Sequence, residues 1–127
     1  MSKRTKDVNY PSKKNVEEFE ILNPLLNGLF SEVKALSQKK QDGVLNVYKV
    51  KMMNKILLRV KQLLVNDPAV EFLDLLDEGT MPTNSDALFM IVQFKSVMQQ
   101  FKNKYYVQIN SSDFIDYETK YDWQTND

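Results

Sequence analysis

The stretch that decides the fold is DALFMIVQFKSVMQQFKNKYY, residues 86–106. Ala87, Phe94 and Phe101 recur in it at intervals of seven residues. A second apolar set has the same interval and alternates with the first at steps of four and three: Ile91, Met98 and Tyr105. This spacing is typical of a helix whose apolar seam packs against other helices. It predicts one long helix over 86–106 that lies against the rest of the chain.

The first turns of this helix, residues 87–92, carry only apolar side chains. A helix that is apolar all round is buried on every side. Two arrangements meet that requirement: the helix start lies at the centre of a bundle, or part of it faces a second chain. In the second arrangement, Leu88 and Phe89 are candidate partner-binding residues.

Apolar residues recur at helical spacing upstream as well. A first helical region is expected from about Asn15 to a stop at Gly43, and Pro24 either begins a new helix within it or kinks a single one. A second helix is expected over 44–65. A short acidic helix is expected over 69–78, and its apolar residues are expected to point inward: Phe72, Leu73, Leu75 and Leu76.

Together these segments predict an all-α fold, a small antiparallel helical bundle of three to four main helices. The bundle domain is expected to span residues 15–106. A flexible, polar and basic arm is expected over 1–14, and an acidic, aromatic tail over 107–127. Residues 107–109 alternate like a strand but have no obvious partner, so we expect coil there.

The composition is that of one soluble domain and excludes many kinds of active site. The chain has 127 residues, of which 43% are hydrophobic and 27% charged, and it contains no histidine and no cysteine. Histidine bases, cysteine nucleophiles, disulfides, and haem, iron–sulfur and Cys/His zinc sites therefore lack their residues. We expect no enzyme activity, no cofactor and no metal site. A carboxylate or Ser–Lys site is the remaining catalytic alternative, and spacing alone does not locate one.

The sequence contains no membrane or secretory signal of a recognisable kind. No apolar run approaches the roughly 20 residues that a membrane span needs. The basic N-terminus, residues 1–6, has no apolar stretch behind it and so lacks the pattern of a secretory signal. These features predict a cytoplasmic protein that does not enter a membrane.

Charge is segregated along the chain, although its 17 basic and 17 acidic residues cancel. Four segments carry the imbalance: +4 over 1–14, +7 over 34–61, −6 over 67–86 and −4 over 107–127. On a helix, Lys51, Lys55 and Arg59 form a row with steps of about 6 Å. Such a row suits phosphate groups, which makes nucleic acid or another anionic ligand an alternative partner. In the other interpretation, the basic helix packs beside the acidic segment, and the charges are paired or solvated.

The tail combines acidic with aromatic residues. Phe114, Tyr117 and Tyr121 have the i, i+3, i+7 spacing of an amphipathic segment that lies in a groove. Trp123 follows them, and Tyr and Trp dominate the energetics of protein interfaces. Two other arrangements stay open. The tail folds back on its own helices so that Trp123 caps the core, or it docks on the basic face of the second helix, in the same chain or in another subunit.

The sequence therefore predicts a non-catalytic helical module for protein–protein interaction or regulation, which also associates with itself. Its expected partner is a protein or a second copy of the chain. The expected partner-binding residues are Leu88, Phe89, Phe114, Tyr117, Tyr121 and Trp123. The alternative is an accessory protein that binds nucleic acid or an anionic ligand through Lys51, Lys55 and Arg59.

Overall fold

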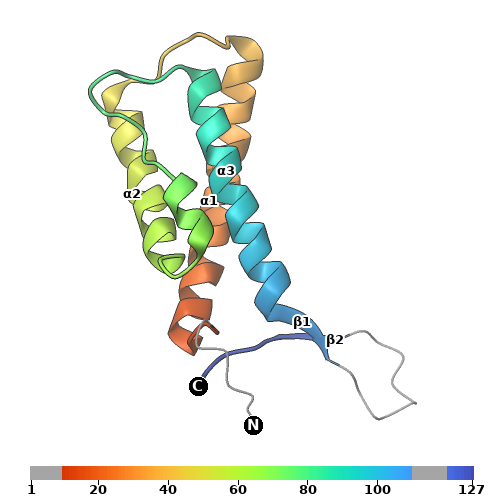
Figure 1. Cartoon of the computed structure of the whole chain (residues 1–127). Coiled ribbons are helices and arrows are strands. Elements are labelled where there is room, and N and C mark those ends of the chain that lie inside the picture. The colour runs from red at the N-terminus through yellow and green to blue at the C-terminus, as the bar shows by residue number, and fades with distance from the viewer. Residues whose placement is uncertain (1–9, 110–119) are drawn as a thin grey trace.

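A computed structural model describes residues 10–109 and 120–127 of the chain. The described part is mostly helical and carries one small two-stranded sheet (Figure 1). The elements follow in the order α1 (Lys13–Lys39), α2 (Val47–Leu63), a short 3-10 helix η1 (Pro68–Phe72), α3 (Asn84–Tyr105), β1 (Tyr106–Ile109) and β2 (Lys120–Trp123). The expected helical class is confirmed, and the described residues add a small two-stranded sheet that the sequence did not predict.

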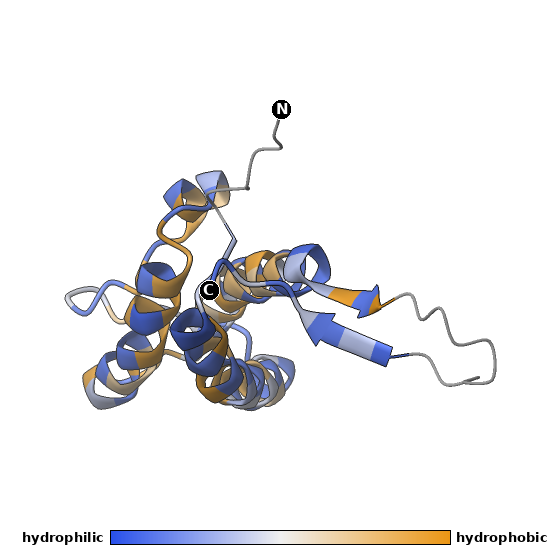
Figure 2. Cartoon of the chain, turned by 90° about the horizontal axis from the view of Figure 1, so that it is seen from below, coloured by the Kyte–Doolittle hydropathy of each residue, from blue (hydrophilic) through white to orange (hydrophobic). Residues whose placement is uncertain are grey.

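The apolar seam of α3 is the centre of the core. α1 packs along α3, and α2 packs along α1, so that their apolar faces turn toward one another (Figures 1 and 2). The seam residues predicted from their spacing are all buried: Ala87, Ile91, Phe94, Met98, Phe101 and Tyr105. None of the helices in the described ranges is both long and apolar enough to cross a membrane.

α1 is one continuous helix that contains Pro24. Its first turn is capped by Ser12, whose hydroxyl accepts a hydrogen bond from the Asn15 N–H at 3.0 Å. The helix therefore begins two residues before the expected start. Of the two expectations for Pro24, a new helix and a kink, the new helix is wrong. Proline removes the bond to the Glu20 carbonyl, but both residues are exposed, so water can satisfy that carbonyl.

The segment after η1 is not the acidic helix that the sequence predicted. η1 ends at Phe72, and the chain then runs without helical structure toward Leu76. The buried Asn54 side chain accepts a hydrogen bond from the Leu76 N–H and donates one to the Leu76 carbonyl, both at 2.9 Å. Leu73 and Leu76 are buried as predicted, whereas Phe72 and Leu75 are 66% and 37% exposed. Leu73 and Leu76 thus enter the core from a segment that is not helical. This is possible because the Asn54 side chain makes the hydrogen bonds that the buried N–H and C=O of Leu76 need.

A β-hairpin replaces the coil expected over 107–109. β1 and β2 pair antiparallel, with Tyr106 opposite Trp123 and Ile109 opposite Lys120. Tyr121 therefore lies in a strand, and its ring stacks on that of Tyr106 with centroids 5.6 Å apart. The helical spacing of the tail aromatics does not extend to Tyr121, because non-local pairing with β1 competes with local helix formation.

The described end of the tail folds back on the helices. The Trp123 ring packs on Phe19 and Phe101, with centroids 5.1 and 6.0 Å apart, and so caps the core. Asn126 donates its N–H to the Pro11 carbonyl at 3.0 Å, and Asp127 accepts from the Lys13 N–H at 2.9 Å. This part of the tail thus lies at the start of α1, where Pro11, Lys13 and Phe19 hold it.

We expect Asn54→Ala to lower the free energy of unfolding by about 2–3 kcal/mol, because it leaves the buried N–H and C=O of Leu76 without partners. Denaturant unfolding followed by circular dichroism measures the loss. Asn27→Ala is the matched control: Asn27 is exposed within α1, where alanine is the better helix former. Equal stability of the two variants would contradict this account of the 73–76 segment.

Candidate functional site

The predicted partner-binding residues fall into two groups at opposite ends of α3. Leu88 and Phe89 lie in its first turns, whereas Tyr121 and Trp123 lie in the hairpin that follows its last turn. α3 has 22 residues, which corresponds to about 33 Å, so the two groups do not form one surface. Phe114 and Tyr117 lie outside the described residues.

The start of α3 is not buried on every side. Leu88 is half-buried against the core, but Phe89 is 66% exposed and Val92 38% exposed. Among the two arrangements proposed for this helix start, the central position in a bundle is therefore wrong. Exposed apolar residues leave a surface to which a second chain can bind.

Lys51, Lys55 and Arg59 all lie exposed on α2. Arg59 forms an ion pair with Glu18 of α1. Its Nε and Nη2 donate to the two carboxylate oxygens of Glu18 at 2.6 and 2.8 Å. The hydrogen bond from Arg59 holds the pKa of Glu18 below its usual value, and Glu18 raises the pKa of Arg59. Basic and acidic residues are thus paired between α2 and α1 at this position, and two lysines of the row remain on the surface.

An apolar groove of about 190 Å³ lies between α1 and α2, which we call the α1–α2 groove. It is formed by the second half of α1, the start of α2 and the connection between them. Its lining residues are Leu29, Glu32, Val33, Leu36, Leu45, Tyr48, Lys49, Met52 and Met53. Apolar side chains thus form most of a concave surface that stays open to solvent.

Two kinds of residue build this groove. Its floor belongs to the core, because Val33, Leu45 and Met53 are only 2–5% exposed. Its α2 wall consists of Tyr48 and Met52, which are four residues apart on one side of the helix and are 69% and 43% exposed. Tyr48 lies in the first turn, which Asn46 caps by accepting from the Lys49 N–H at 2.8 Å. The wall is therefore held on a well-formed helix.

The rim of the groove is basic on the α2 side. Lys49 lines the groove, and Lys55 follows Met52 by three residues and Tyr48 by seven, so it lies on the same side of the helix. Within 10–109 and 120–127, no ion pair engages Lys49, Lys51 or Lys55. These cations therefore have no carboxylate partner among the described residues.

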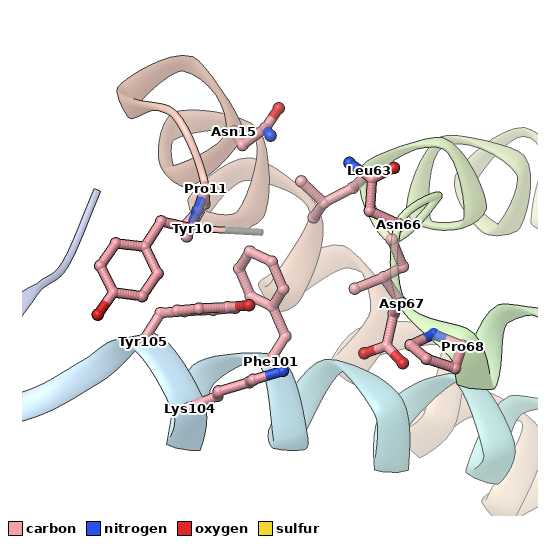
Figure 3. A pocket seen from close by; sticks show the side chains of 11 residues that line it. Tyr10, Pro11, Asn15, Leu63, Asn66, Asp67, Pro68, Phe101, Lys104 and Tyr105 are labelled. Carbon is pink, nitrogen blue, oxygen red and sulfur yellow. The ribbon is translucent and has the colours of Figure 1, made fainter. Parts of the chain in front are cut away.

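A second, polar pocket lies where the start of α1, the end of α2 and the end of α3 meet (Figure 3). Tyr10, Asn15, Asn66 and Asp67 are among the residues that line it. Its volume is about 60 Å³, which suits a few water molecules and is far below the roughly 300–1,000 Å³ of ligand pockets. Asp67 is already used there, since its carboxylate caps η1 by accepting from the Ala69 N–H at 2.9 Å.

The described residues bring together no set of three or more carboxylates that could hold a metal ion. Asp74 and Asp77, the acids near η1, lie in the irregular segment rather than on a shared helix face. The α1–α2 groove differs from the polar pocket in its mostly apolar lining and in the exposed side chains of its α2 wall.

The sequence predicted a helix over 44–65 but did not identify Tyr48 and Met52 as the wall of a groove. The available signal was the four-residue step from Tyr48 to Met52, which marks a second apolar strip beside the lysines. Comparison with protein-family models, with curated proteins and with solved structures finds no match. The function of the groove therefore has to follow from its own shape and charge.

The Glu18–Arg59 pair predicts a pH-dependent contribution to stability. The folded-state pKa of Glu18 is lowered, so this contribution is present above the unfolded pKa, near the usual 4.5, and is lost as the pH falls through the lower folded pKa. We expect Arg59→Met to lower the Tm slightly at pH 7 and to have no effect in strong acid. Lys55→Met, which removes no such pair, is the control. A Tm difference for Arg59→Met that persists unchanged into strong acid would argue against the pair.

Proposed function

We propose that this chain is a non-catalytic protein–protein interaction module, a small antiparallel helical bundle that binds an acidic, amphipathic segment in the α1–α2 groove. The observation that carries the proposal is the pair of exposed apolar side chains, Tyr48 and Met52, above a floor of buried core residues. Exposed apolar side chains at a concave surface favour a partner that removes them from water.

The apolar part of the groove has the features of a helix-in-groove site. In such sites an amphipathic segment inserts anchors spaced at i, i+3 or i+4 between the walls of a groove. Tyr supplies a large contact area at a low entropic cost and is enriched among residues that dominate binding. Met52 and Met53 add side chains that adapt to different anchors. These properties support a peptide-like partner.

The charged rim supports an acidic partner. Lys49, Lys51 and Lys55 lie on the α2 side, and complementary charge increases both the association rate and the specificity of an interface. Glu32 lines the α1 wall, so the carboxylates of the partner are expected along α2. Nucleic acid is the less favoured partner for this face, since Arg59 is bound to Glu18 and the sequence pI is about 6.3.

The start of α3 offers a second exposed apolar surface at Phe89 and Val92. It borders a shallow groove with Phe30, over whose ring the Lys95 ammonium lies at 4.1 Å. Lys95 thus covers the aromatic ring of this shallow groove, whose other lining residues include the polar Ser96 and Gln99. The lining of the α1–α2 groove is mostly apolar, which favours it as the binding surface.

The test uses the chain with ¹³C-labelled methionine methyl groups and two synthetic amphipathic helices. Both peptides carry Leu at i, i+3, i+4 and i+7; one has Glu and Asp elsewhere, and the other has Lys. We expect the acidic peptide to shift the Met52 resonance and Tyr48→Glu to weaken its binding roughly tenfold or more, the loss of one major anchor. Phe89→Glu is the matched control, because Phe89 and Tyr48 are 66% and 69% exposed.

Three results would reject the proposed site. The first is that the acidic peptide leaves Met52 unshifted. The second is that the Lys peptide binds as tightly as the acidic one, which would remove the role of the basic rim. The third is that Phe89→Glu, and not Tyr48→Glu, abolishes binding, which would move the interaction to the start of α3.

A further inference from the structure

The chain itself contains a segment with the chemistry that the groove requires. Residues 113–118 read Asp-Phe-Ile-Asp-Tyr-Glu, three carboxylates among three apolar residues. Phe114 and Tyr117 are three residues apart, a spacing that suits two anchors on one side of a bound segment. The segment lies outside the described residues, between β1 and β2.

The flanking strands prevent this segment from reaching the groove of its own chain. Ile109 and Lys120 are paired, so both ends of the intervening ten residues are fixed at one place. Five extended residues from each end reach about 18 Å at most. Trp123, at the base of the hairpin, contacts Phe19, and the groove begins at Leu29, about 15 Å further along α1, with Val33 of its floor at about 21 Å. The segment starts at the other end of the strands, three residues or about 10 Å beyond Trp123. The strands also lead away from the helices (Figures 1 and 2).

We propose that the α1–α2 groove binds residues 113–118 of a second copy of this chain, so that the chain associates with itself. This inference rests on the proposed function and names the occupant of the same groove. In the bound state, Phe114 and Tyr117 contact Tyr48 and Met52. The carboxylates of the segment lie along the α2 wall.

Charge complementarity between the two surfaces supports this occupant. Residues 34–61, which include the α2 wall, carry a net charge of +7, and the region 107–127 carries −4. Asp113, Asp116 and Glu118 match Lys49, Lys51 and Lys55 in number and are opposite in sign. Since exposed charges are screened by salt, self-association is expected to weaken as the salt concentration rises.

The positions of groove and hairpin favour a closed dimer. The hairpin follows the last turn of α3, whereas the groove lies by the second half of α1, near the other end of the helices (Figure 1). Two copies related by a two-fold axis, with their helices in opposite directions, place each hairpin beside the groove of the other. Both contacts then form at once and the assembly closes, as in most homodimers.

The test is a complementation experiment on the full chain, followed by sedimentation velocity. The first variant, Tyr48→Glu, alters the groove; the second, Phe114→Ser with Tyr117→Ser, alters the segment. We expect the wild type to be dimeric and each variant alone to be monomeric, with self-association weakened roughly tenfold or more. An equimolar mixture should regain dimers, since one copy supplies an intact groove and the other an intact segment.

The variants are chosen so that the fold survives. Tyr48 is 69% exposed in the first turn of α2, where an acidic residue also complements the helix dipole. Met52→Glu serves as a second groove variant if thermal unfolding shows that Tyr48→Glu is destabilised. Phe89→Glu is the control for exposed apolar surface elsewhere and should remain dimeric.

A monomeric wild type, or a mixture that stays monomeric up to the highest soluble concentration, overturns the inference. So does a Phe89→Glu variant that loses its dimer while both test variants keep theirs. The proposed function fails independently, because binding of the synthetic acidic helix at Met52 is measured on the segment variant, whose groove is intact. Binding there, combined with a monomeric wild type, retains the groove and rejects the second copy as its occupant.

Discussion

Every other part of this structure depends on burial of the apolar seam of α3. Ile91, Phe94 and Met98 are at most 1% exposed, and burial of each such side chain contributes about 1.5–3 kcal/mol. α1 covers most of the seam, η1 covers another part, and the hairpin closes its last turn. α2 contacts α3 less extensively and is held mainly through α1. α1 therefore packs on both α3 and α2, and the α1–α2 groove lies between its second half and the start of α2.

The helices could be predicted because their apolar residues repeat at the helical period over many turns. The seam of α3 is the clearest example, since all six residues identified from spacing are buried. The failures occurred where one distant contact decides the local conformation. Residues 73–76 follow the two hydrogen bonds of Asn54, and β1 exists because β2 pairs with it from ten residues further along. The sequence of 73–76 does not reveal that Asn54 binds it, and the sequence of β1 does not reveal that β2 pairs with it.

In the candidate site, too, features that depend on spacing within one helix could be predicted, whereas contacts between distant segments could not. The row of Lys51, Lys55 and Arg59 was correctly predicted to lie exposed on one helix, because that depends on spacing within the helix alone. The pairing of Arg59 with Glu18 and the meeting of Leu29 and Leu36 with Tyr48 depend on how α1 and α2 are placed. The four-residue step from Tyr48 to Met52 marks one wall of the groove, but no pattern within α2 identifies the α1 residues that lie opposite.

The contacts that join the beginning of α1 to the residues after β2 bear on the order in which the chain is made. Lys13 and Asp127 are hydrogen-bonded across 114 positions, and Phe19 receives the Trp123 ring. During synthesis α1 leaves the ribosome long before Trp123, so Phe19 and Phe101 must wait for their last aromatic neighbour. The nascent chain therefore exposes an aromatic surface until Trp123 has emerged, an interval in which chaperones can act on it.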